Sequence, residues 1–210
     1  MIMESLIDGF GAKSGWIAVR SDDRDAVVAG IGLTEVREAS WPEALGACNA
    51  YMGEFLVTPP LPGKGGNWVL VGGLVLDPIG DGGELAELSA RLGTEVQLFH
   101  THRTVDDHAW MRAVKGQLVR AFHFSMESIR LWDGKPDAVE QQASNGALAN
   151  YADVSTRPEA LGLLEQGGEN FLYVTEEDVD NVAREWSLSP LFLILDAAEI
   201  GPALIGRWVQ

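Results

Sequence analysis

Histidines gather in one stretch of the chain, Gly93 to Phe124, which holds all four imidazoles of the sequence. His100 and His102 are two residues apart, so on a predicted strand both side chains lie on the same face of a sheet. Imidazole is the commonest ligand of zinc-like metals and the side chain best suited to acid–base chemistry near neutral pH. This stretch is therefore the first place to look for a binding or catalytic site.

A hairpin in the same stretch positions the other two histidines. Lys115-Gly116 fits a two-residue turn, and counting outward from it sets His108 opposite His123 on neighbouring strands. Asp106 and Asp107 stand beside them and could add a carboxylate. One hypothesis is thus an enzyme or a small-ligand or metal-binding protein that uses the sheet of residues 93–124. Its candidate residues are His100, His102, Arg103, His108, Trp110, Arg120 and His123.

Three features argue against a bound metal ion. The His100-x-His102 pair is a weak signal, because the helical HExxH pattern of zinc enzymes is absent. Arg103 follows directly, and its positive charge would oppose a cation. Cys48 is the only cysteine, so neither a thiolate cluster nor an intrachain disulfide can form. We predict no metal and no cofactor, and interpret the histidines chiefly as side chains packed within the sheet.

Covalent catalysis has no support in the sequence. Ser89, Ser125 and Ser128 lack the G-x-S-x-G setting of a serine nucleophile, and Cys48 falls on the inward face of a predicted helix. The glycine-rich loop of residues 77–83 carries two acids and no base, so it would repel phosphate. We therefore predict that the protein is not an enzyme and has no catalytic residue.

Acidic side chains dominate the charge of the chain. Its 210 residues carry 31 acids and 15 bases, and the net charge of −16 repels nucleic-acid phosphates and anionic lipid. Nine acids and a single base, Arg184, lie between Glu165 and Glu199. Such a surface can recruit a basic protein by electrostatic steering. The candidate partner-binding residues are Glu169, Glu176, Glu177, Asp178, Asp180 and Glu185.

Two simpler interpretations of these acids stay open. A high net charge keeps a protein soluble without any partner. The acids that follow Thr175 also crowd the first turn of a predicted helix, where the helix dipole favours negative charge. Val179, Val182 and Trp186 give that helix an apolar face that is typical of core packing.

Length and composition indicate one globular domain, residues 1–210. Apolar residues make up 46% of the chain and charged residues 22%, which is ordinary for a soluble protein. The first ten residues, MIMESLIDGF, have no basic region and no long apolar run, so we expect no signal peptide. No stretch approaches the roughly 18 apolar residues of a spanning helix. We expect a cytoplasmic protein with no membrane or nucleic-acid partner; the sequence leaves its oligomeric state open.

Periodicity predicts an α+β fold with a mostly antiparallel central sheet and four to five flanking helices. One helix is expected to follow Asp23 and to end at about Ile31. Others are expected from Trp41 to about Met52, over residues 84–92 and after Thr175. Strands are expected at 14–20, 34–38, 54–58, 68–76, across most of 93–124, at 128–132 and in the apolar segments near the C-terminus. Ser40 to Glu43 has the form of a capping box, and Pro62 to Asn67 of a loop.

Two internal echoes leave a two-lobed arrangement open. SWPEALG at 40–46 recurs as TRPEALG at 156–162, and the strand–cap–helix pattern of 16–33 recurs at 171–188. These echoes favour pseudo-symmetric lobes, 1–132 and 150–210, joined by a loop-rich excursion at 133–149. The alternative is that the chain simply reuses the same capping chemistry.

The ordered motifs of the histidine stretch resemble an uncharacterised bacterial protein family. They are Thr101-His102-Arg103, His108-Ala109-Trp110 and Gly116-Gln117-Leu118-Val119-Arg120-Ala121, after a W-V-L-V strand at 68–71. The shared signature is T-H-R…H-x-W…G-x-x-V-R, and the resemblance covers about 68–124. Members have no assigned enzymatic activity and are similar to immunity proteins encoded beside secreted antibacterial toxins. The resemblance implies a protein that binds and neutralises a cognate toxin (effector) with a basic surface. The ligand-binding hypothesis and a partnerless scaffold stay open beside it.

Overall fold

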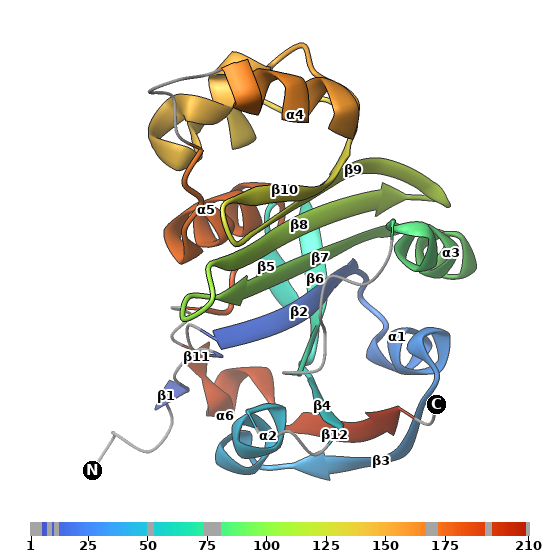
Figure 1. Cartoon of the computed structure of the whole chain (residues 1–210). Helices are drawn as coiled ribbons and strands as arrows, with labels where there is room; N and C mark the ends of the chain where they lie inside the picture. Colours follow the sequence, from blue (N-terminus) through green and yellow to red (C-terminus); the bar gives the residue numbers. More distant parts are fainter. Residues whose placement is uncertain are drawn as a thin grey trace.

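A ten-stranded antiparallel sheet organises the chain, with helices on both of its faces (Figure 1). The computed structural model describes residues 6–7, 10, 13–49, 53–73, 81–166, 172–191 and 195–208. Across the sheet the strands run in the order β10-β9-β8-β7-β2-β6-β4-β12-β3, and β5 pairs with β6. The predicted α+β class with a mostly antiparallel sheet is confirmed.

The strands of the sheet are β2 (Lys13–Arg20), β3 (Leu33–Ala39), β4 (Glu54–Val57), β5 (Leu61–Gly63), β6 (Gly66–Gly72), β7 (Glu95–His102), β8 (Asp107–Val114), β9 (Gln117–Ser125), β10 (Ser128–Asp133) and β12 (Ala203–Trp208). The short strands β1 (Leu6–Ile7) and β11 (Leu195–Asp196) pair with each other. The helices in the described residues are α1 (Arg24–Ile31), α2 (Trp41–Cys48), α3 (Gly83–Leu92), α4 (Arg157–Gln166), α5 (Glu176–Trp186) and α6 (Ala197–Ile200), with the 3₁₀ helices η1 (Glu140–Gln142) and η2 (Ser144–Tyr151). In these residues no helix is both long enough and apolar enough to cross a membrane.

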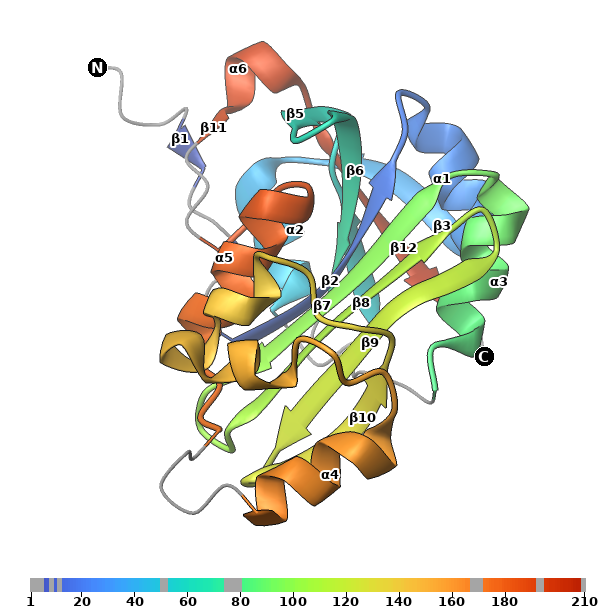
Figure 2. The same cartoon turned by 90° about the horizontal axis from the view of Figure 1, so that it is seen from above.

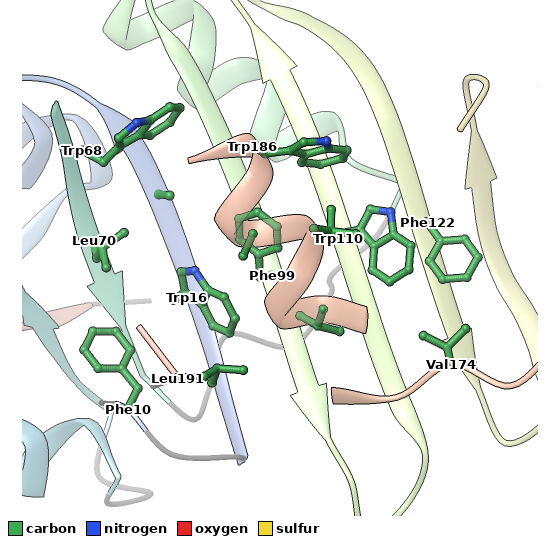
Figure 3. Packing of buried hydrophobic residues seen from close by; sticks show 14 of the residues in the cluster. Phe10, Trp16, Trp68, Leu70, Phe99, Trp110, Phe122, Val174, Trp186 and Leu191 are labelled. Carbon is green, nitrogen blue, oxygen red and sulfur yellow. The ribbon is translucent and has the colours of Figure 1, made fainter. Parts of the chain in front are cut away.

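One face of the sheet, which we call the tryptophan face, carries stacked aromatic rings (Figure 3). Trp16 stacks on Phe99 at 5.1 Å between ring centroids, and Trp110 stacks on Phe122 at 4.3 Å. Helices α2, α4 and α5 and the 3₁₀ helix η2 contribute buried side chains to this cluster. Aromatic pairs at these distances add about 0.5–1.5 kcal/mol each beyond their buried area. This face therefore holds the larger and more aromatic core.

The opposite face, the aliphatic face, is covered by α1 and α3 (Figure 2). Val27 and Ile31 of α1 and Leu85 and Leu88 of α3 pack on the strands. Their partners in the sheet include Val19, Val69, Val96, Leu98 and Met111. Because α1 and α3 are short, this face is only partly covered along its length (Figure 2).

A β-bulge corrects the predicted hairpin register. The Lys115-Gly116 turn forms, and Ala113 pairs with Leu118, but Arg112 then pairs with Arg120 because Val119 is an extra residue on β9. One inserted residue shifts every later pair, so His108 faces Phe124 and Ala109 faces His123. The predicted pairing of His108 with His123 is wrong.

The end of the chain returns to its beginning. Strand β12 lies between β3 and β4 and pairs antiparallel with both, while α5 packs against β7 and β8. Helices do begin at both copies of the repeated motif, α2 at Trp41 and α4 at Arg157. The second copy has no counterpart of β4, since residues 172–175 are irregular and Phe171 lies outside the described residues.

Several local predictions also changed. The predicted capping box does not form: the Ser40 side chain makes no capping hydrogen bond, and Glu43 pairs with Arg37 at 2.8 Å. The segment predicted as a loop at 62–67 is a tight hairpin between β5 and β6. Helix α2 ends at Cys48 and β6 at Gly72, and the predicted continuations at 50–52 and 74–76 lie outside the described residues.

Candidate functional site

The candidate ligand residues of the histidine stretch divide between the two faces of the sheet. Strand alternation places His108 on the tryptophan face with Trp110, whereas His100, His102 and His123 lie on the aliphatic face. The four imidazoles therefore do not converge. Among the residues that the structure describes, no three His, Cys, Asp or Glu side chains are arranged to hold a metal ion.

The two histidines of the hairpin have internal partners. His108 is buried, its Nδ1 lies 3.0 Å from Thr101 Oγ1, and burial lowers its pKa from 6.5 to about 4. His123 Nε2 lies 2.7 Å from Asp107 Oδ1. His108 is therefore neutral at physiological pH, and His123 is oriented by a carboxylate. Both contacts stabilise the end of the hairpin.

Trp110 and Arg120 belong to a buried cluster that we call the Arg120 network. Arg120 Nε and Trp110 Nε1 both donate to Glu140 Oε1, at 2.7 and 2.6 Å, and the Arg120 guanidinium lies 4.4 Å from the ring centre of Trp132. Burial raises the pKa of the Glu140 carboxyl, and the Arg120 charge opposes that rise. Arg120 Nη1 donates to three backbone oxygens, those of Ala121, Asp133 and Gly134.

The same network ties the irregular segment to α5. Asp137 caps η1 by accepting from the backbone of Val139 and Glu140, and its Oδ2 accepts from Trp186 Nε1 at 2.7 Å. Glu140 was absent from the sequence-based candidates, because its partner is 20 residues away and no local pattern links them. A signal did exist, since Arg120 lies in a strand that alternation leaves facing the core. Trp110 and Arg120, two of the candidate ligand residues, therefore have a structural role in this network.

Of the candidate acids, two are used inside the fold. Asp178 completes a capping box with Thr175, and its Oδ1 also accepts from the backbone of Ser144 at 3.0 Å. Asp180 is buried and accepts from Ser189 Oγ at 2.6 Å, while Arg184 pairs with its other oxygen. These contacts hold α5 in place.

The remaining candidate acids lie on the outer side of α5. Glu177 is exposed and Glu176 is half-buried, and neither forms an ion pair. Glu185, also exposed, pairs with Lys64 near the other end of the helix. Glu169 lies outside the described residues. Among the remaining candidate acids that the structure describes, Glu176 and Glu177 at the start of α5 are the two without an ion pair, and Glu185 is exposed and paired.

A polar groove of about 530 Å³ runs between α5 and the segment around η1. Its polar lining consists of Gln142, Asp178, Asn181, Arg184 and Glu185, so it includes one base beside the two acids. Amide and carboxylate groups of this kind can accept hydrogen bonds from the ammonium or guanidinium group of a basic protein.

Two neighbouring turns form what we call the open tip, residues 103–106 and 126–127. The first joins β7 to β8 and the second joins β9 to β10. The Met126 amide donates to the Asp106 carbonyl at 3.3 Å, so the turns touch. Val105 is 44% exposed and Met126 66% exposed. Arg103, a ligand candidate from the sequence, is exposed here, and His102 Nδ1 lies 2.9 Å from Thr104 Oγ1.

The first turn of α5 lies at the same end of the sheet as the open tip. Helix α5 packs along β7 and β8, and Trp186 at its end lies beside Gln97 near the start of β7. Asp178 is close enough to His108, near the start of β8, to act on it electrostatically. The first turn of α5, which carries Glu176 and Glu177, therefore lies toward the end of the sheet at which β8 begins.

The open tip was not a candidate from the sequence, where Val105 and Met126 stood as isolated apolar residues between strands. Only the turn geometry brings them together.

Comparisons of this chain with protein-family models, curated proteins and solved structures found no match.

Proposed function

We propose that this chain is an immunity-type protein of the cytoplasm, which binds and neutralises a cognate antibacterial toxin through the acidic surface at the start of α5. The observation that carries the proposal is the state of Glu176 and Glu177. Neither forms an ion pair with the described residues; Glu177 is exposed, and Glu176 is half-buried with one carboxylate oxygen shielded from solvent. Asp178 and Asp180, in contrast, make hydrogen bonds or ion pairs inside the fold. Unpaired acids in a chain of net charge −16 are the groups that a basic partner can engage.

The mechanism is electrostatic capture followed by steric cover. A negative surface attracts a basic toxin over a Debye length of about 8–10 Å and raises the association rate, most strongly at low salt. Once bound, the body of the inhibitor covers the basic active site and excludes its substrate. No covalent step is required of this chain. The buried Cys48 thiol, whose pKa burial raises to about 12, is unsuited to one.

The alternative, an enzyme or small-ligand protein on the sheet of residues 93–124, takes second place. Its candidate residues are divided between the two faces of the sheet. Trp110 and Arg120 both donate hydrogen bonds to the buried Glu140 carboxylate. No described contact favours a reaction at that surface.

The test uses the product of the gene adjacent to the one encoding this chain. We expect that product to be toxic when expressed alone, and co-expression of the wild-type chain to restore growth. Purified wild type should bind it with an association rate constant that falls as salt rises. A harmless product, or toxicity unchanged by co-expression, would show the proposed function to be wrong.

Matched charge reversals locate the surface. Glu176→Lys with Glu177→Lys should lower the association rate constant by about tenfold at low salt, since rim charges act mainly on association. Glu84→Lys with Glu87→Lys makes the same charge change on exposed acids of α3, on the aliphatic face. Thermal unfolding of both variants checks that they fold. Equal losses from the two pairs would mean that net charge, and not the α5 surface, governs binding.

A further inference from the structure

We propose that the open tip is an apolar anchor, with Met126 and Val105 inserting into an apolar pocket of the partner protein that is bordered by basic side chains. This inference rests on the proposed function. It assigns the contact that slows dissociation of the complex to the open tip, and not to the α5 acids. The occupant is a protein, because exposed apolar side chains on two adjoining turns are the kind of group that a pocket on another protein can enclose.

Exposure is the first support. Met126 is the most exposed large apolar side chain in the described part of the chain, at 66%. Val105, at 44%, sits on the adjoining turn, held there by the hydrogen bond from the Met126 amide to the Asp106 carbonyl. Scattered exposed apolar residues need no explanation, but these two lie on turns that are hydrogen-bonded to each other. Interface hot spots are compact groups of this kind.

Backbone conformation is the second, independent support. Met126 and Glu127 have φ values of 48° and 60°, the left-handed pattern of a type I′ turn, and Asp106 has φ 46°. Asn and Gly dominate such turns because other side chains are strained there. A bulky methionine at this position is strained and also exposed. Conformations like this collect at binding sites, where the strain is offset by what the side chain contacts.

Rigidity is the third support. The strands beneath the tip are joined by the His123–Asp107 contact at 2.7 Å and the buried Thr101–His108 contact at 3.0 Å. Each turn is also short and closed by strand pairing. A projection that is ordered before binding loses little conformational entropy when it is bound, so its contacts contribute fully to affinity.

Charge identifies the chemistry of the partner. Asp106 and Glu127 are sequence neighbours of the two apolar side chains, and Glu176 and Glu177 belong to the turn of α5 whose Asp178 acts on His108 near the start of β8. Arg103 is the one base in the two turns. An apolar centre with an acidic rim matches a pocket with an apolar floor and basic edges. This is the chemistry already expected of a partner that the α5 acids attract.

The experiment separates association from dissociation. The probe is the purified product of the adjacent gene, immobilised, and the rate constants are measured by surface plasmon resonance. Val105→Ser with Met126→Ser should raise the dissociation rate constant by about tenfold or more, as expected when hot-spot side chains are lost, and leave the association rate constant nearly unchanged. The α5 charge reversals should show the opposite division. Val119→Ser, at an equally exposed apolar side chain (49%) near the other end of β9, is the control and should change neither.

Every outcome bears on the proposal. An unchanged dissociation rate in a variant that unfolds like wild type overturns the anchor and leaves the proposed function standing. An equal effect of Val119→Ser also overturns it, since any exposed apolar residue would then serve. If wild type does not bind the probe at all, the proposed function fails and this inference falls with it.

Discussion

Two hairpin turns in this protein have the same backbone shape and opposite surroundings. Lys115-Gly116 and Met126-Glu127 each join neighbouring strands through two residues with positive φ. In the first turn Gly116 is packed against α3: its amide lies 3.2 Å from Ser89 Oγ, and a Cβ there would lie 2.9 Å from the Ala90 Cβ. In the second turn neither residue is a glycine, and Met126 projects into solvent.

The difference shows which features of the sequence the fold itself requires. Gly116 is explained by conformation and by close packing. Met126 occupies the turn position of Lys115, which has the same φ of 48°, and it differs from Lys115 in exposing an apolar side chain. The contrast extends to the ends of the sheet that carry the turns. Near Gly116, the Arg120 network pairs buried charges internally, whereas at the open tip charged and apolar side chains face solvent.

Removing Glu140 should have the largest effect on stability of any change proposed at either end of the sheet. Glu140→Ala leaves Arg120 buried without its carboxylate, and we expect the free energy of unfolding to fall by about 3–5 kcal/mol. Urea denaturation followed by circular dichroism measures the change. The exposed-end control, Glu127→Ala, should stay within about 0.5 kcal/mol. Arg120→Met with Glu140→Met should recover part of the loss, because no lone charge remains buried. A small effect of Glu140→Ala would mean that the ion pair does not hold the segment of residues 133–152.

Lowering the pH should have the second-largest effect on stability, through His108 near the open tip. His108 has a folded-state pKa of about 4, below its ordinary value of 6.5, so the unfolded chain binds its proton more readily. Stability from this group is complete above about pH 6.5 and is lost as the pH falls toward 4. One pKa unit corresponds to about 1.4 kcal/mol, so the loss near pH 4 is about 2–3 kcal/mol.

The groups that face His108 are Asp106, Asp107, His100 and Asp178, and the three carboxylates partly oppose the effect of burial. Stability measured from pH 7.5 to 4.5 in wild type and in His108→Asn tests the assignment. The variant should be less stable at pH 7.5, yet lose less on acidification. Parallel curves for the two proteins would place the acid sensitivity elsewhere.

Local signals predicted much of this architecture. The Asp23 cap and Gly32 end of α1, the strands β2, β7 and β8, and the Lys115-Gly116 turn all follow from short-range chemistry. The predictions that were wrong depend on one inserted residue or on partners that are distant in the sequence. The bulge at Val119 moved His108 away from His123, since a one-residue shift reverses every side chain on a strand.

The candidate site shows the same limit. Asp178 and Asp180 were recognised as acids at a helix start, but their partners Ser144 and Ser189 lie outside that helix. Glu140 meets Arg120 only because the segment after β10 folds back on the tryptophan face. The two turns of the open tip are about 20 residues apart along the chain, and no periodicity could join them.

Exchanging the chemistry of the two turns gives the smallest effect and the most direct comparison. Glu127→Gly removes a side chain from φ 60°, which relieves about 1–2 kcal/mol of left-handed strain and restores about 0.5–1 kcal/mol of glycine entropy to the unfolded state. We expect a net gain of about 0.5–1 kcal/mol, seen as a higher melting temperature in calorimetry. Gly116→Ala, at φ 88° and against Ala90, should lose about 1–2 kcal/mol. Changes of the same sign would mean that both turns are set by the fold alone, and the strain at Met126-Glu127 would then carry no argument for binding.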